Sequence, residues 1–269
     1  MDIHPTAIIG EEVRLGKGCK IGPYSIIEGD VSLGENCTVQ SRAFLKGKLR
    51  IGNNNLIGHG AIIGEEPQDF DFKASTQSEV IIGDNNTFRE YVTIHRGTKE
   101  GTATTVGNHN FLMCGAHLGH NCTMGDHNVV ANNCLFAGYV TVGNRNVFGG
   151  GSLYHQFITV SDMIMLRGGS IWGKDIPPYI IGSGTNTVRG LNSIGLRRNG
   201  LSAEARAEVK EAFRLIYHSD LLLKEALAES EKKDWLPEAA AFLDFFKRKT
   251  KRGFCQARTS GRQAEYRNE

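Results

Sequence analysis

The sequence predicts a mainly β protein, in which a parallel β-helix is followed by a small C-terminal α-helical domain. Three observations predict it. An apolar residue recurs every six positions up to residue 172, glycine often follows that residue, and apolar residues take helical spacing only after residue 200. A period of six does not match the 3.6-residue period of an α-helix. It suits a coil with three flat faces, each face a short strand and each corner a turn.

The six-residue repeat falls into three runs. Ile, Leu or Val occupies every sixth position from 3 to 63. The six-residue spacing resumes over positions 82 to 94 and again from 106 to 172, where Phe, Met, Tyr and Trp also take the apolar position. Self-similarity at a fixed short period is the signature of a solenoid. The 26 repeats correspond to roughly nine coils of three. At ~4.8 Å per coil they predict a prism about 40 Å long, filled by one internal apolar column.

Turn-forming residues occupy the expected corners of this prism. Glycine often stands directly after the inward apolar residue, and Asn-rich triplets occur at 53–55, 84–86 and 144–146. Gly and Asn tolerate positive φ better than other residues. We therefore expect them to supply the left-handed backbone conformations at the corners.

Two segments interrupt the repeat, and two prolines end it. Loop insertions are expected near 65–79 and 96–104, where the phase is lost. Pro177 and Pro178 have no N–H to donate to a further strand, so no strand is expected after them. The β-helix domain is therefore expected to occupy residues 1–184.

Residues 185–269 are expected to form the helical domain. Ser202 is a suitable N-cap for a first helix, a second is expected over 221–229, and a third begins near Pro237, where the missing N–H of proline does no harm. The polar residues after about 253 lack periodicity and are expected to form a frayed tail.

Composition excludes several classes of protein. The 31 basic and 29 acidic side chains leave a net charge of +2, so no general attraction to nucleic acid is expected. No apolar run approaches the roughly 18 residues of a membrane span, and no secretory signal is visible, so we expect a cytoplasmic protein without integral membrane contact. The six cysteines contain no CxxC pair, which argues against a zinc finger or redox motif.

Six short segments occur in order along the chain: Pro-Gln-Asp at 67–69, Thr-Ile-His-Arg-Gly-Thr at 93–98, Ala-His-Leu-Gly-His at 116–120, Tyr-His-Gln-Phe at 154–157, Asp-Ile-Pro-Pro-Tyr at 175–179 and Gly-Leu-Asn-Ser-Ile-Gly-Leu-Arg-Arg at 190–198. With the hexapeptide repeat, they resemble the UDP-N-acetylglucosamine O-acyltransferases, which carry out the first step of lipid A biosynthesis. The resemblance spans roughly residues 1–253. It implies a left-handed β-helix and a homotrimer with sites in the clefts between subunits.

The resemblance also implies a catalytic mechanism. His120 matches the general base, which would take the proton of the sugar 3-hydroxyl as that oxygen attacks the thioester of a 3-hydroxyacyl carrier protein. Imidazole suits this task because it titrates close to neutral pH. Gly138 matches the residue whose backbone N–H stabilises the oxyanion. No metal and no cofactor are implied, because the acyl carrier protein thioester is a co-substrate.

Further residues match substrate contacts of the family. The matching positions are Gln68, Asp69, His95, His117, His155, Gln156, Gly168, Asn192, Arg197 and Arg198. Asp69 and His117 match contacts to the sugar or nucleotide, Gly168 matches the residue that measures acyl length, and a small residue there implies a long chain. Asn192 and Arg198 match contacts to the uridine diphosphate, for which bidentate guanidinium donors are well suited.

The chain departs from the family at two positions near the general base. Asn121 stands where Asp is usual, and Tyr139 replaces a common His. Asparagine keeps a hydrogen-bonding oxygen but loses the charge that would stabilise an imidazolium. Asn121 therefore predicts slower catalysis. The Asn-Ser-Ile-Gly variant at 192–195 suggests altered acceptor contacts, as for a UDP-3-amino sugar.

Three other interpretations fit the repeat. A γ-class carbonic anhydrase would bind zinc through three histidines from two subunits, for which His95, His117 and His120 are candidates. A sugar acetyltransferase would use acetyl-CoA as the donor. A structural solenoid without activity would be unaffected by His120→Ala. The four interpretations can be distinguished by metal analysis, by a comparison of acyl donors and by the His120→Ala variant.

Overall fold

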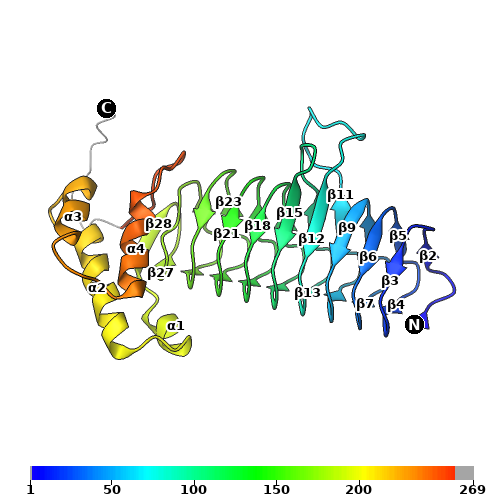
Figure 1. Cartoon of the computed structure of the whole chain (residues 1–269), viewed down its shortest axis with the longest axis horizontal. Helices are drawn as coiled ribbons and strands as arrows, with labels where there is room; N and C mark the ends of the chain where they lie inside the picture. The colour runs from blue at the N-terminus through cyan, green and yellow to red at the C-terminus, as the bar shows by residue number, and fades with distance from the viewer. Residues whose placement is uncertain (1, 258–269) are drawn as a thin grey trace.

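The chain forms a long three-sided β-helix with helices gathered at its C-terminal end (Figure 1). This computed structural model describes residues 2–257. Nearly all neighbouring strands are parallel, and Ile3 pairs with Ile21 as Leu118 pairs with Phe136, so one coil usually takes 18 residues. The predicted β-helix and the helical domain after it are confirmed.

Within residues 2–257, face A of the prism is a twelve-stranded sheet. Its strands, in spatial order, are β1 (Asp2–Ile3), β4 (Lys20–Ile21), β7 (Thr38–Val39), β10 (Leu56–Ile57), β13 (Thr87–Phe88), β16 (Phe111–Leu112), β19 (Val129–Val130), β22 (Val147–Phe148), β25 (Met165–Leu166), β27 (Ile180–Gly182), β28 (Thr187–Leu191) and β29 (Gln256–Ala257). Along most of this face, the second residue of each two-residue strand is buried inside the prism.

In the described part of the chain, face B has nine strands and face C has eight. Face B consists of β2 (Ile8–Ile9), β5 (Ile26–Glu28), β8 (Phe44–Lys46), β11 (Ile62–Glu65), β14 (Thr93–His95), β17 (His117–Leu118), β20 (Leu135–Phe136), β23 (Leu153–Tyr154) and β26 (Ile171–Trp172). Face C consists of β3 (Arg14–Leu15), β6 (Val31–Leu33), β9 (Lys48–Ile51), β12 (Glu79–Ile82), β15 (Ala103–Val106), β18 (Thr123–Met124), β21 (Thr141–Val142) and β24 (Thr159–Val160).

Most glycines that follow an inward residue have ordinary φ values, so the prediction that they supply left-handed backbone is wrong for them. They are needed for close approach between coils, because a Cβ on Gly16 would lie 2.4 Å from the carbonyl carbon of Gly34. Positive φ occurs in the middle of the Asn-rich corners instead, at Asn54 (55°), Asn85 (59°) and Arg145 (57°).

The last residue of each Asn-rich corner is buried and forms part of a ladder. Asn86 Nδ2 donates to Asn55 Oδ1 at 3.1 Å, and Asn110 Nδ2 donates to Asn86 Oδ1 at 3.0 Å. The ladder continues through Asn128 to Asn146. These bonds hold successive coils in register and satisfy the buried amides up to Asn128, whereas the side-chain NH₂ of Asn146 has no hydrogen-bond partner among the described residues.

Both loop insertions leave the prism at the edge between faces B and C, and the first projects well away from the coils beside β11 and β12 (Figure 1). Residues 66–78 separate β11 from β12, and 96–102 separate β14 from β15. Arg96 holds the first loop against the prism. Its Nη1 donates to the carbonyl oxygen of Thr76 at 2.8 Å, and its guanidinium lies 4.9 Å from the centre of the Phe72 ring.

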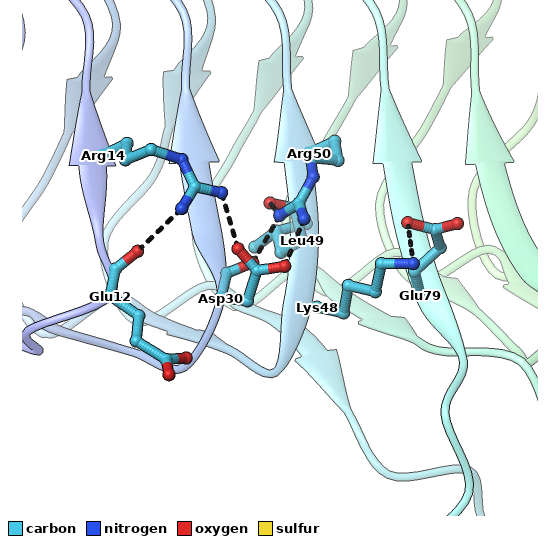
Figure 2. Close-up of polar contacts among 7 residues, drawn as sticks. All are labelled: Glu12, Arg14, Asp30, Lys48, Leu49, Arg50 and Glu79. Atoms are coloured by element: carbon cyan, nitrogen blue, oxygen red, sulfur yellow. Dashed lines mark hydrogen bonds and ion pairs between the residues drawn. The ribbon is translucent and has the colours of Figure 1, made fainter.

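Face C is polar along most of its outer surface. At its N-terminal end the Asp30 carboxylate pairs with both Arg14 and Arg50, and Lys48 pairs with Glu79 at 3.4 Å (Figure 2). The hydrogen bonds from Arg50 and Arg14 lower the pKa of Asp30 to about 2. Threonines occupy the outward positions of the later coils, at 105, 123, 141 and 159.

Strands continue beyond the two prolines, so the prediction that none would follow is wrong. Pro177 and Pro178 lie in the bend before β27, where no ladder N–H is required of them. β27 pairs in parallel with β25, and β28 pairs antiparallel with β27. Face A therefore extends past residue 184, where the sequence suggested the domain boundary.

The helical domain contains four helices within the described residues: α1 (Ser193–Arg198), α2 (Ala203–Tyr217), α3 (Leu223–Ser230) and α4 (Pro237–Lys247). The hydroxyl of Ser202 accepts from the N–H of Ala205, which confirms the predicted N-cap, and Pro237 opens α4 as predicted. The short α1 was not predicted. None of the described helices is long and apolar enough to cross a membrane.

The segment after residue 253 is attached to the prism. β29 pairs with β28, Cys255 is buried, and the Cys255 N–H donates to the carbonyl oxygen of Asp175 at 2.9 Å. The predicted fraying after about 253 is therefore wrong for residues 254–257. The rest of the predicted tail lies outside the described residues.

Candidate active site

Three successive coils stack their corners at the edge between faces B and C. His120, Gly138 and Gln156 occupy equivalent corner positions after β17, β20 and β23. The next residue of each corner has positive φ, 59° at Asn121 and 60° at Tyr139. This left-handed residue turns the chain into face C and leaves the preceding side chain directed away from the prism.

The imidazole of His120 lies directly over Gly138. A Cβ built on Gly138 would be 2.3 Å from His120 Cε1 and 2.5 Å from Nε2. No side chain at position 138 is compatible with this arrangement unless the ring moves. The two residues matched by resemblance to the general base and the oxyanion donor are therefore in contact.

A cavity of about 530 Å³ opens beside this pair. Seven of the twelve predicted site residues line it: Gln68, His95, His117, His120, Gly138, His155 and Gln156. They come from the first loop insertion and from corners and strands of face B. The sequence had placed these residues on separate segments, and the β-helix brings them together.

One wall of the cavity is apolar and was not predicted. Leu135, Leu153 and Ile171 point outward from successive strands of face B, with 42%, 42% and 50% of their surface exposed. Each directly precedes an inward residue, so the repeat phase could have identified them. The cavity thus has polar groups at the edge of the prism and an apolar strip along its face.

His117 is held as a neutral imidazole. Its Nδ1 lies 2.7 Å from the Thr93 hydroxyl, and its ring meets that of His95 edge to face at 5.1 Å between centres. Burial, followed by the neighbouring His95 and His120, lowers its pKa to about 4. Burial likewise lowers the pKa of His95. At neutral pH both rings can therefore act as hydrogen-bonding groups without charge.

Two predicted residues do not line this cavity. Asp69 is exposed beside Gln68, and its carboxylate accepts from the N–H of Asp71 at 3.0 Å. Gly168 lies at the edge between faces A and B, where a Cβ would be 2.9 Å from the carbonyl oxygen of Gly150. Their proposed contacts with the substrate stay predictions.

The predicted residues of the helical domain also lie outside the cavity. Asn192 caps α1, accepting from the Gly195 N–H at 3.1 Å and donating to the carbonyl oxygen of Met163 at 2.9 Å. Arg197 is exposed in the last turn of α1. Arg198 lines a second cavity of about 640 Å³ together with Arg145 and other residues of the edge between faces C and A. Within one chain, these residues do not reach the lining of the His120 cavity.

The described residues of a single chain do not arrange the histidine cluster around a metal ion. Across residues 2–257, no group of three or more His, Cys, Asp and Glu side chains is arranged to hold a metal ion. Within one chain, His95, His117 and His120 share the cavity but not a common coordination point.

Comparison with known proteins identifies the family. The profile described as UDP N-acetylglucosamine O-acyltransferase, domain 2, matches residues 175–255, and that of the bacterial transferase hexapeptide repeats matches 12–47 and 103–138. The chain is 56% identical to the acyl-[acyl-carrier-protein]--UDP-N-acetylglucosamine O-acyltransferase of Chlorobaculum tepidum over 249 residues, covering 91% of this chain and 94% of that protein. The chain belongs to the UDP-N-acetylglucosamine O-acyltransferase family.

Other members of this family support the assignment. The Chlorobaculum parvum enzyme is 55% identical over 91% of this chain and 93% of its own length, whereas the Synechocystis relative aligns over 63% of its length at 39% identity. The UDP-N-acetylglucosamine acyltransferase structure from Bacteroides fragilis superposes with a TM-score of 0.89 at 39% identity, covering 94% of this chain and 99% of that one. The left-handed β-helix and the acyltransferase class are thereby confirmed, and the alternative functions are not favoured.

Proposed function

We propose that this chain transfers a 3-hydroxyacyl group from acyl carrier protein to the 3-hydroxyl of UDP-N-acetylglucosamine, the first step of lipid A biosynthesis. Family membership supports the reaction class. The observation that carries the assignment of roles is the contact between the His120 imidazole and Gly138 at the head of a cavity with one apolar wall.

His120 acts as the general base in this proposal. It takes the proton of the sugar hydroxyl while the oxygen attacks the thioester carbonyl carbon, and the tetrahedral intermediate then expels the carrier thiol, which receives that proton. The N–H of Gly138 has no hydrogen-bond acceptor among residues 2–257, so it is available to the oxyanion. The thioester supplies the acyl group, so no further cofactor is proposed.

The cavity provides suitable surfaces for both substrates. Gln68, His117 and Gln156 present neutral hydrogen-bonding groups for the sugar near the reacting hydroxyl. The acyl chain is proposed to lie along Leu135, Leu153 and Ile171, where its burial would contribute roughly 0.8 kcal/mol per CH₂ group.

We further propose that the active protein is a homotrimer. The later coils carry apolar outward residues on two faces, including Val147 on face A and Leu153 on face B, whereas face C carries threonines. Packing face A of one copy against face B of the next would bury both strips. It would also bring Arg198, on the face A side, toward the next copy's His120 cavity.

A cytoplasmic location stays a prediction that cell fractionation would test.

Purified protein with UDP-N-acetylglucosamine and a series of 3-hydroxyacyl carrier proteins tests the assignment. We expect turnover with one range of acyl lengths and little with acetyl-CoA. His120→Ala should lower kcat by about 10²-fold or more, because the general base is lost. His59→Ala, which changes an exposed histidine outside the cavity, should keep wild-type activity. Equal activities of the two variants would refute the role of His120.

A further inference from the structure

We infer that the hydroxyls of Thr98 and Tyr139 are positioning groups that orient His120 through the side-chain amide of Asn121. This inference rests on the proposed role of His120 as the base. Thr98 belongs to the second loop insertion, Tyr139 to the corner after β20, and Asn121 directly follows the histidine. Three segments of the chain thus converge behind one imidazole.

The backbone of Thr98 determines which way the Asn121 amide faces. The Thr98 N–H lies 3.0 Å from Asn121 Oδ1. A backbone N–H can only donate, so the atom that faces it must be the amide oxygen and not the NH₂ group. The same oxygen lies 3.1 Å from His120 Nδ1.

The direction of every other hydrogen bond follows from this constraint. The amide oxygen only accepts, so the Thr98 hydroxyl, 3.0 Å away, must donate its single proton to it. The Tyr139 hydroxyl, 3.0 Å from Thr98 Oγ1, must then donate to Thr98. His120 must carry a proton on Nδ1, because an unprotonated Nδ1 would place two acceptors face to face.

This arrangement leaves Nε2 unprotonated and ready to take a proton. Nε2 is on the Gly138 side of the ring, 2.5 Å from the position that a Cβ of residue 138 would occupy. The ring is also fixed laterally, because it packs edge to face on Tyr139 at 5.3 Å between centres, and Tyr139 stacks on Phe157 at 5.0 Å. The neutral amide of Asn121, held by two donors of Thr98, therefore orients the base in place of a carboxylate.

The tautomer can be measured without substrate by ¹⁵N NMR of histidine-labelled full-length protein. We expect His120 to carry its proton on Nδ1 in the wild type. In Asn121→Gly we expect a substantial Nε2–H population, and glycine adopts the positive φ of this position without strain. A wild-type His120 protonated on Nε2, or a variant with the same tautomer as the wild type, would overturn the inference.

Kinetics test the two hydroxyls. Thr98→Val should lower kcat about threefold and Asn121→Gly about tenfold, the size expected for weakening or losing one neutral hydrogen bond, with little change in KM. Thr98→Ser keeps the hydroxyl and should restore kcat, whereas Tyr139→Phe should resemble Thr98→Val. Equal kcat in the Val and Ser variants would refute the role of the hydroxyl. If the protein shows no acyltransferase activity, the proposed function fails while the tautomer measurement still decides the inference.

Discussion

Gly138 is the residue at which one methyl group should decide activity. Alanine there would place its Cβ 2.3 Å from His120 Cε1, so the imidazole must move out of its position over the corner. The backbone φ at Gly138 is not positive, so alanine adds little strain to the chain itself. We expect Gly138→Ala to lower kcat by about 10²-fold through the displaced base. The melting temperature should change little. Steady-state kinetics with thermal unfolding would check this, and full activity would contradict the proposed geometry.

His117 should make stability depend on pH. Its pKa falls from 6.5 to about 4 on folding, so the unfolded chain binds a proton at a pH where the folded chain does not. Its contribution is therefore fully present above pH 6.5 and is lost as pH falls toward 4. Urea unfolding at pH 7 and pH 5 should show a smaller pH-dependent loss in His117→Gln than in the wild type. An identical loss in both proteins would contradict the burial of this ring.

Between elements, Asp175 joins the last coils to the helical domain. This carboxylate is 4% exposed, and it accepts from the Thr159 N–H at 2.8 Å and pairs with Arg248, just after α4, at 3.2 Å. Asp175→Ala should cost about 2 kcal/mol or more, because a partly buried guanidinium and a backbone N–H lose their partner. Asp244→Ala, which removes an exposed pair with Lys247, should cost less than about 0.5 kcal/mol. Chemical denaturation compares the two, and equal costs would refute this role.

The coils and both loop insertions could be predicted because the inward phase is a local property of the sequence. By the same phase, His117 and His120 fall outside the inward positions 112, 118 and 124. The reason for glycine at the corners was less predictable. Gly16 must lack a side chain because the backbone of Gly34 in the next coil lies against it. Likewise, nothing in the sequence indicates that Thr98 lies against Asn121. The six-residue α1 is too short for a periodic signal, and its cap at Asn192 depends on a contact with Met163.

At the scale of the whole molecule, the predicted site is divided. Seven of the predicted site residues line the His120 cavity, whereas Arg198 lines a different cavity on the face A side of the same chain. A solenoid is rigid along its length, and Arg198 is the last residue of α1, which is fixed to the last coils through Asn192. Bringing Arg198 to the His120 cavity of the same chain would require the coils to rearrange. Association of copies through faces A and B would bring Arg198 of one copy toward the His120 cavity of the next without any change in the fold.

Mixed trimers test this arrangement directly. His120→Ala and Arg198→Ala should each be nearly inactive alone, because one lacks the base and the other lacks a cation for the diphosphate. If each site combines His120 of one copy with Arg198 of the next, co-expression of the two variants creates some sites with both residues intact. Random assembly would restore about a quarter of wild-type activity per site, since each half is intact with a probability of one half. If both residues served a site within the same copy, every site would carry one defect. Co-expression would then restore no activity.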